Sequence, residues 1–395
     1  MVEARKRQVQ KIDPILLVVV LALGAFSCMA LLAASYGKSA AIIGTTHIVE
    51  KQMVWEIVGL IAMIGVATYD YRLLRKWRWW IYGISLFLLI AVYGFSPINN
   101  AHSWIHFGSF TVEPSEFAKL GLIIAVAASM AAIDEQEEPQ YGIRNVVPTF
   151  GLLVVPFALT YKEPALGQAL VMFSIVMTMY VVFAKRTHFV MLSSLLLIII
   201  AGVAYMAIQL PVQFTNFVEN LVKHKVLRGF QVDRIVAWIN PNFDLQTTGY
   251  AVHHAQIAVG SGGLFGEGLF KGILTSSAGV PNQTTDYIFT AIGEEFGFVA
   301  SGSLILLFLI LVYRISKAAA LSSDSFGTYI LMGIAGMFGF QVFENIGMNM
   351  YLSPATGITL PFISYGGTSL VANYMAIGLC ISVAVHRKQS MFTKT

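Results

Sequence analysis

Ten apolar segments, each close to the length needed to cross a lipid bilayer, dominate this sequence. A helix crosses the hydrocarbon core with about 20 apolar residues, because each residue advances it by about 1.5 Å. The segments are residues 14–35, 53–69, 79–95, 117–133, 146–161, 164–184, 189–210, 287–313, 326–350 and 366–385. The pattern predicts an all-α polytopic membrane protein with ten transmembrane helices.

The composition supports this fold class and excludes a soluble enzyme. Of the 395 residues, 56% are hydrophobic and 12% are charged, whereas soluble domains average about 45–50% and about 25%. Cys28 and Cys380 lie in apolar segments at opposite ends of the chain, so neither a structural disulfide nor a cysteine-based zinc site is expected. The modest net charge of +4 gives no basis for a nucleic-acid partner.

Lys and Arg are divided unevenly between the connections. Cytoplasmic loops of membrane proteins carry an excess of these residues. If the N-terminus is cytoplasmic, 16 of the 25 Lys and Arg residues lie in inner segments and eight in outer ones, five of the eight in a single long loop. The distribution predicts a multi-pass protein of the cytoplasmic (inner) membrane with both termini in the cytoplasm.

The connection between the seventh and eighth spans is much longer than the others. Residues 211–285 form an extracytoplasmic loop of about 75 residues, whereas most connections contain only a few. Within it, residues 214–227 and 250–259 have the pattern of amphipathic helices that could lie on or near the membrane face. Neither an internal repeat nor a separate soluble domain is visible, so residues 1–395 are predicted to form a single integral membrane domain.

Ionisable residues within the spans gather in their outer halves. Such residues are costly in lipid and usually face a cavity or a partner. Glu294 and Glu295 lie about 12 Å into the eighth span, counted from Asp286 at its outer end. The others are Glu56, Lys119 and Glu344, with Glu113 and Glu116 just before the fourth span. Their grouping predicts a polar cavity that faces outward, and structural ion pairs between helices are the alternative.

A glycine-rich stretch in the long loop is a weaker candidate. Residues 260–263, followed by Gly266 and Gly268, could present backbone N–H groups to a phosphate, although such a stretch is more often a flexible turn. The adjacent His253 and His254 would diverge on a helix, so no metal-ligating residues are predicted. A P-loop motif for nucleotide binding is absent from the sequence.

Several sequence blocks follow one another in a characteristic order along most of the chain. They are residues 113–119, 163–170, 240–250, 258–268, 285–297, 345–348 and 354–367, the last containing Leu360-Pro361-Phe362-Ile363-Ser364-Tyr365-Gly366-Gly367. In these blocks the sequence resembles the SEDS family (shape, elongation, division and sporulation), which includes RodA, FtsW and SpoVE. The short tail after His386 and residues 343–349 favour the RodA branch.

The resemblance implies that the protein is a peptidoglycan glycosyltransferase. Members of the family polymerise lipid II, a disaccharide-pentapeptide on undecaprenyl diphosphate, into glycan strands on the outer face of the cytoplasmic membrane. In the RodA branch this reaction serves cell elongation and rod-shape maintenance. The resemblance also implies a class B penicillin-binding protein, a transpeptidase, and other elongation-complex membrane proteins as partners. It implies no certain cofactor and leaves a divalent cation as an open possibility.

The resemblance also assigns roles to individual residues. Asp244 matches the family's catalytic aspartate and is expected to be the general base for the attacking sugar hydroxyl, with an Asx turn or helix cap as the structural alternative. Lys119 is the expected partner of the diphosphate, and Glu116 would tune it through an i,i+3 pair. Further expected substrate-binding residues, some of which could equally well position helices, are Glu294, Glu295, Asp286, Ser364, Gly262 and Gly263.

The sequence departs from the family pattern at four places. Leu245 stands where a proline usually follows the catalytic aspartate. The common Q-P-D-L-G is replaced by Glu163-Pro164-Ala165-Leu166-Gly167, in which Ala165 stands in place of the aspartate. Thr284 and Ser103 replace a usual histidine and a common arginine. These departures put in doubt a contribution of those four positions to the reaction.

Three alternatives stay open from the sequence. A lipid II flippase would also have ten spans and intramembrane charges, but its polar groups should extend through the membrane and its halves should show inverted repeats or broken helices. A scaffold would only recruit a transpeptidase. An FtsW-type paralogue would perform the same reaction in cell division.

Overall fold

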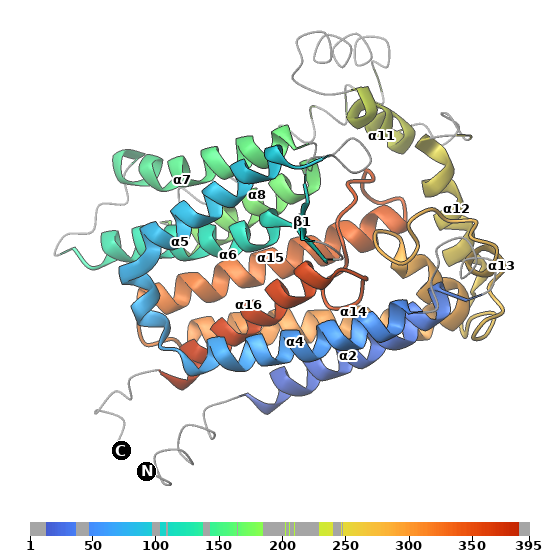
Figure 1. Cartoon of the computed structure of the whole chain (residues 1–395), viewed down its shortest axis with the longest axis horizontal. Helices are drawn as coiled ribbons and strands as arrows, with labels where there is room; N and C mark the ends of the chain where they lie inside the picture. The colour runs from blue at the N-terminus through green and yellow to red at the C-terminus, as the bar shows by residue number, and fades with distance from the viewer. Residues whose placement is uncertain are drawn as a thin grey trace.

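The computed structural model describes residues 13–36, 47–96, 103–107, 110–136, 143–163, 165–184, 229–239 and 248–386, with the single positions 202, 205, 209 and 246. The described chain forms a bundle of long helices with short elements gathered at one end (Figure 1). The predicted all-α polytopic class is confirmed at this level.

Eight of the described helices are long and apolar enough to cross a membrane. They are α2 (Pro14–Ala34), α4 (Ile48–Thr68), α5 (Tyr71–Ala91, continued by the 3-10 turn Val92–Gly94), α6 (Pro114–Asp134), α8 (Leu166–Phe183), α14 (Ile288–Ala320), α15 (Ser325–Asn349) and α16 (Gly367–Val385). A further helix, α7 (Ile143–Lys162), has a shorter apolar part and contains Pro148 and Pro156.

These helices coincide with nine of the ten expected segments. The expected seventh span, residues 189–210, lies outside the described residues apart from three positions. The number of ten spans and the length of the loop after the seventh therefore stay predictions.

Helices α6 and α15 form the centre of the bundle, because small side chains let their neighbours approach closely. Nearly every residue of α6 is buried, including the alanine-rich stretch 125–131. Gly333 of α15 packs against Met179 of α8 and Ile123 of α6, where an added Cβ would lie 2.9 Å from the Met179 sulfur. Close approach through small residues is the usual way that helices associate in membranes.

A two-stranded hairpin precedes α6 and was not expected from the sequence. Strands β1 (Ile105–Phe107) and β2 (Phe110–Val112) are antiparallel, with Ile105 opposite Val112. The hairpin is tied to the start of α16, because the Thr368 hydroxyl donates to the carbonyl of Thr111 at 3.0 Å. It therefore lies at the end of the bundle where α6 and α16 begin.

Three short helices lie at this same end: α11 (Gly229–Ile239), α12 (Thr248–Ser261) and α13 (Ile273–Ser276) (Figure 1). The expected amphipathic helix at residues 250–259 is part of α12, which packs along α14. The other, residues 214–227, lies outside the described residues.

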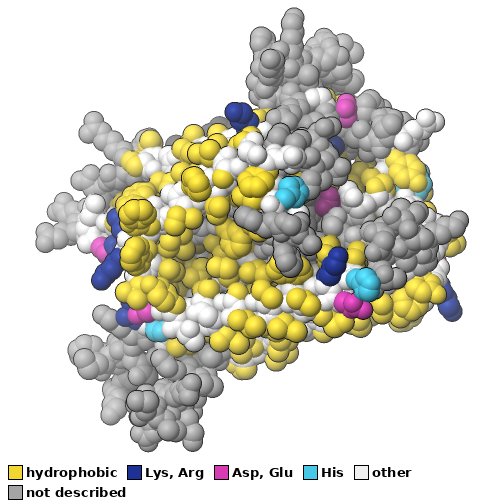
Figure 2. All heavy atoms as spheres, viewed as in Figure 1, with side chains coloured by type: hydrophobic (Ala, Val, Ile, Leu, Met, Phe, Trp, Pro, Cys, Tyr) yellow, Lys and Arg dark blue, Asp and Glu magenta, His cyan; other side chains and the backbone are white. Residues whose placement is uncertain are grey.

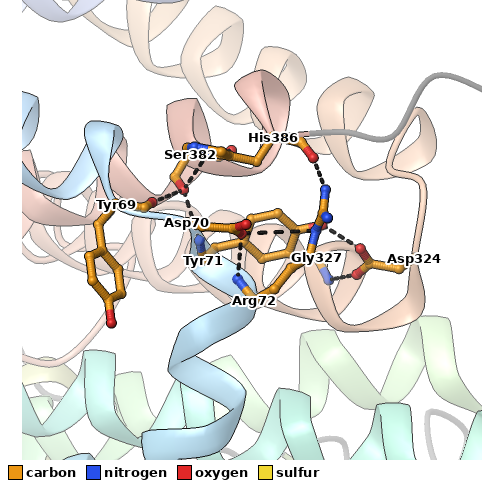
Figure 3. Close-up of polar contacts among 8 residues, drawn as sticks. All are labelled: Tyr69, Asp70, Tyr71, Arg72, Asp324, Gly327, Ser382 and His386. Carbon is orange, nitrogen blue, oxygen red and sulfur yellow. Dashed lines mark hydrogen bonds and ion pairs between the residues drawn. The ribbon is translucent and has the colours of Figure 1, made fainter.

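Polar contacts at the opposite end of the bundle join the connections between spans. The Ser382 hydroxyl in α16 donates to the carbonyl of Tyr69 at 2.6 Å and accepts from the N–H of Tyr71 at 3.1 Å (Figure 3). Asp324 caps α15 by accepting from the N–H of Gly327 at 2.7 Å and also accepts from the hydroxyl of Tyr71. The turn between α4 and α5 is thus fixed to both α15 and α16.

Ion pairs at this end hold further termini of spans together. Arg314, late in α14, contacts Asp13 before α2 at 2.5 Å, and Arg75 of α5 contacts Glu135 after α6 at 2.6 Å. The described ends of the segments expected to be cytoplasmic therefore lie together, whereas the side of the membrane they face stays a prediction.

Candidate functional site

A buried ion pair lies at the start of α6, as expected from the i,i+3 spacing. The Lys119 Nζ is 2.8 Å from Glu116 Oε2, and both side chains are 1% exposed. The Lys119 ammonium also donates to Gln168 Oε1 at 3.0 Å. The charges of Lys119 and Glu116 are tolerated in a site that excludes water because they are paired and hydrogen-bonded.

Gln168 of α8 connects this pair to a second carboxyl. Its Nε2 donates to Glu116 Oε1 at 2.9 Å and to Glu113 Oε1 at 3.1 Å. Glu113, at the N-cap position of α6, also accepts from the Ser115 hydroxyl at 2.7 Å. Glu113, Glu116 and Lys119 thus lie on one face of α6, toward Gln168. Gln168 was not predicted as a site residue. Its one distinguishing feature in the sequence is that it carries the only amide side chain in the apolar segment 164–184.

Glu163 completes what we call the outer polar cluster: Glu113, Glu116, Lys119, Glu163 and Gln168. Glu163 follows α7 and is fully buried, and neither of its carboxyl oxygens has a hydrogen-bond partner among the described residues. Burial, and then the neighbouring Glu113, raise the pKa of Glu163 to about 8. Burial, and then Glu116, raise the pKa of Glu113 to about 7. In the sequence, Glu163 is recognisable only as part of a family motif. Its burial could not be predicted, because it depends on segments distant in the chain.

An apolar groove of about 560 Å³ lies on another face of α6, between α4, α5, α6 and α16. Phe117, Leu120 and Gly121 of α6 line it, and among its described lining residues Ser85 and Tyr69 carry side-chain oxygen atoms. Hydrophobic side chains cover most of this face between the charged groups at its two ends (Figure 2). Helix α6 therefore presents polar residues to α8 and apolar residues to the groove.

Glu294 and Glu295 bind the segment that follows α12. Glu294 accepts from the N–H of Leu274 at 2.7 Å and from the N–H of Thr275 at 2.8 Å. Glu295 accepts from the N–H of Phe270 at 2.9 Å. These contacts agree with the alternative that both residues hold elements together, and their expected binding of substrate stays a prediction.

The turn after α12, which contains Gly262 and Gly263, packs against the first turns of α14. An added Cβ on Gly262 would lie 1.9 Å from the carbonyl oxygen of Gly293, so only glycine fits there. The carbonyl of Gly263 accepts from the N–H of Phe298 at 2.9 Å. Further along the turn, the N–H groups of Glu267 and Gly268 donate to carbonyls of α14, which leaves those two unavailable to a phosphate.

Asp286 and Ser364 lie where the chain enters α14 and α16. The Asp286 carbonyl accepts from Asn345 Nδ2 at 2.8 Å, and burial raises the pKa of its side chain. The Ser364 hydroxyl donates to the carbonyl of Thr285 at 2.6 Å and accepts from the N–H of Leu360 at 2.8 Å. Asn345 of α15 and Ser364, in the connection before α16, thus both donate hydrogen bonds to the connection before α14.

Arg234 of α11 is a cation that the sequence did not single out. Its Nη1 donates to the carbonyl of Ala355 at 3.1 Å and its charge acts on Asp286. Helix α11 is docked on the connection between α15 and α16, since Trp238 Nε1 donates to the carbonyl of Tyr351 at 3.2 Å.

Asp244, the expected catalytic residue, lies outside the described residues. Its neighbours in the chain, α11 and α12, lie at the same end of the bundle as the outer polar cluster (Figure 1). Among the described residues, no group of three or more His, Cys, Asp or Glu side chains is suited to hold a metal ion.

Comparison with known proteins gives consistent matches. Residues 13–389 match the FtsW/RodA/SpoVE family of cell cycle proteins. Stage V sporulation protein E of Bacillus subtilis is 33% identical over 339 residues, which cover 85% of this chain and 86% of that protein. The peptidoglycan glycosyltransferase RodA of Treponema pallidum is 28% identical over 435 residues, covering 96% of this chain and 99% of that protein.

Solved structures share the fold over nearly the whole chain. A chain from a peptidoglycan synthase complex, solved to explain the coordination of polymerization and crosslinking, superposes with a TM-score of 0.72 at 27% identity. The match covers 96% of this chain and 99% of that chain. RodA of Thermus thermophilus superposes with a TM-score of 0.65 at 25% identity, covering 96% and 98%. This chain therefore belongs to the FtsW/RodA/SpoVE family of cell cycle proteins, the SEDS family expected from its motifs.

Proposed function

We propose that this peptidoglycan glycosyltransferase polymerises lipid II into glycan strands on the outer face of the cytoplasmic membrane, in cell elongation rather than division. Asp244 is proposed as the general base that takes the proton of the attacking sugar hydroxyl. Such a base contributes about 10²–10⁴-fold to the rate of a reaction.

The observation that carries the proposal is the division of α6 into a polar and an apolar side. Glu116 and Lys119 belong to the outer polar cluster, whereas Phe117, Leu120 and Gly121 line the groove. A lipid diphosphate has the same division, with a charged head joined to a long apolar chain. The groove suits the chain, and Lys119 suits the head once the head displaces part of its present pairing.

A class B penicillin-binding protein is proposed as the partner. The similarity to a chain from a complex that joins polymerization and crosslinking supports this partner. The elongation role is supported by relatives named RodA, although relatives named FtsW match at comparable identity.

The test is formation of glycan strands from lipid II in proteoliposomes that hold the full chain with its transpeptidase. We expect Asp244→Asn to lower turnover by about 10²–10⁴-fold while thermal unfolding stays near that of wild type. Asp233→Asn in α11 is the matched control and should keep full activity. Equal activity of wild type and Asp244→Asn would exclude Asp244 as the base.

The same proteoliposomes distinguish the enzyme from a flippase. Glycan strands made from lipid II that is already on the outer leaflet require a transferase and no transport. Movement of lipid II across the bilayer without any strands would support transport and contradict the proposal.

A further inference from the structure

The outer polar cluster contains three carboxyl groups and a single cation. Glu113 and Glu116 come from α6 and Glu163 from the end of α7, against the ammonium of Lys119. Lys162, which precedes Glu163 in the chain, places its Nζ 5.5 Å from the ring centroid of Tyr93. If all three carboxyls were ionised, the cluster would carry a net charge of about −2, which would repel a diphosphate.

Of the three carboxyls, Glu163 has the surroundings least able to stabilise a negative charge. Its side chain is fully buried, and within the described part of the chain neither oxygen has a hydrogen-bond partner. By contrast, Glu116 accepts from Gln168 and pairs with Lys119. An ionised carboxylate with no donor in a dry site is strongly disfavoured, whereas a neutral carboxylic acid is tolerated there.

Glu113 has more hydrogen-bond donors than Glu163 but, unlike Glu116, forms no ion pair in the cluster. It accepts hydrogen bonds from Ser115 and Gln168, but it lies within the field of both Glu116 and Glu163. The charged groups that act on Glu113 are Glu116 and Lys119 of α6, while α8 contributes the neutral Gln168, and Glu113 in turn acts on Glu163. Lys119 and Glu116 already neutralise each other, so within the cluster a second and third negative charge would have no counterion.

We propose that Glu163 and Glu113 take part in the reaction as protonated, neutral carboxyls, which allows a cluster rich in acids to accept a diphosphate-bearing lipid. With both groups neutral, the net charge of the cluster is about zero. This inference rests on the proposed function, because it requires that the ligand be a lipid diphosphate.

The protonation states follow from the surroundings described above. The raised pKa values of Glu163, about 8, and Glu113, about 7, agree with neutral carboxyls near neutral pH. Alkaline pH should ionise both groups and weaken binding of the anionic head. Glu163 and Glu113 are therefore positioning residues that set the charge of the cluster.

The test compares wild type with Glu163→Gln, Glu113→Gln and the double variant. Glutamine keeps the shape of a neutral carboxyl and cannot ionise. In wild type we expect the KM for lipid II to rise by roughly tenfold between about pH 7 and about pH 9, with a smaller change in kcat. Glu163→Gln cannot ionise, so its KM should rise less than that of wild type at alkaline pH. The KM of the double variant should rise least.

The control is Glu50→Gln, an exposed carboxyl at the start of α4, which should follow the wild-type profile. The ionisation of the diphosphate itself is common to all variants and cancels in the comparison. Loss of more than about 100-fold in Glu163→Gln at every pH, with normal thermal unfolding, would overturn the proposal, because it would require an ionised Glu163. Parallel pH profiles of wild type and the double variant would overturn it as well.

Binding of undecaprenyl diphosphate to the full chain separates this inference from the proposed function. If the chain binds this probe and its affinity falls at alkaline pH in wild type but not in the double variant, the inference holds even where no polymer forms. If the affinity of both proteins has the same pH dependence, the inference fails even where polymerisation succeeds.

Discussion

Glu294 binds Thr275 twice. Its Oε2 accepts from the backbone N–H of Thr275 at 2.8 Å and from the hydroxyl of the same residue at 2.5 Å. Glu294 lies in α14 and is buried, whereas Thr275 lies in the short helix α13. Together with the hydrogen bond from the N–H of Leu274, this contact attaches α13 to a helix long enough to span the membrane.

Replacing Glu294 by glutamine should release this segment. An amide nitrogen would stand where a carboxylate oxygen now accepts, so at least one N–H of residues 274–275 would lose its partner, at a cost of about 1–3 kcal/mol. We expect faster amide hydrogen exchange over residues 270–276. Glu295→Gln is the comparison and should have a smaller effect, because Glu295 accepts one hydrogen bond, from Phe270. Unchanged exchange in Glu294→Gln would contradict this role.

Gly297 should be intolerant of any side chain. Its φ of 74° and ψ of −167° interrupt α14, and an added Cβ would lie 2.2 Å from the backbone nitrogen of Gly266. The dihedral strain alone costs about 1–3 kcal/mol, so Gly297→Ala should lower the thermal unfolding temperature clearly. Gly302→Ala, in the same helix with nothing within 4 Å of its added Cβ, should be neutral or slightly stabilising. Equal unfolding temperatures would disprove the close approach.

The Lys119–Glu116 pair can be separated into structural and functional parts by a double-mutant cycle. Lys119→Met leaves Glu116 as an unpaired buried charge and should destabilise the protein by about 3–5 kcal/mol. Lys119→Met combined with Glu116→Gln removes both charges and should recover much of that loss. If Lys119 binds the diphosphate, the double variant stays inactive although it unfolds like wild type. Recovery of activity would show that the pair is only structural.

Ser382 should contribute to stability at the opposite end of the bundle. Ser382→Ala deprives the N–H of Tyr71 of its acceptor and should cost about 1–3 kcal/mol, measured as a lower unfolding temperature in detergent. Ser129→Ala removes only a local hydrogen bond to the carbonyl of Ala125 within α6 and should have little effect. Similar shifts in the two variants would argue against the connection shown in Figure 3.

Stability should depend on pH through Glu163. Its pKa in the folded protein, about 8, lies above the ordinary value of a glutamate, so the folded state binds the proton more tightly than the unfolded state. Wild type should therefore lose stability as the pH rises from about 5 to about 9, relative to Glu163→Gln. Thermal unfolding of the two proteins at several pH values measures this difference, and a constant difference would contradict a neutral buried Glu163.

The spans and the Lys119–Glu116 pair were predictable because they depend on local spacing. Apolar runs of about 20 residues specify membrane helices, and residues three apart on a helix are neighbours whatever the rest of the chain does. The motif residues of the family were recognisable for the same reason, since they are read from the linear sequence. Asp244 and the seventh span were predicted in this way and stay predictions.

Contacts between distant segments were decided only by the tertiary structure. Gln168 reaches Glu116 across 52 positions, and Ser382 reaches Tyr71 across 311, so no local pattern could reveal either contact. The burial of Glu163, which follows α7, depends on segments distant in the sequence, such as the one that holds Ser103, whose hydroxyl donates to the carbonyl of Glu163. The sequence determined which segments enter the membrane, because hydrophobicity is a property of each segment. Packing decided which polar groups meet, because an unpaired polar group in lipid is costly and its partner comes from another helix.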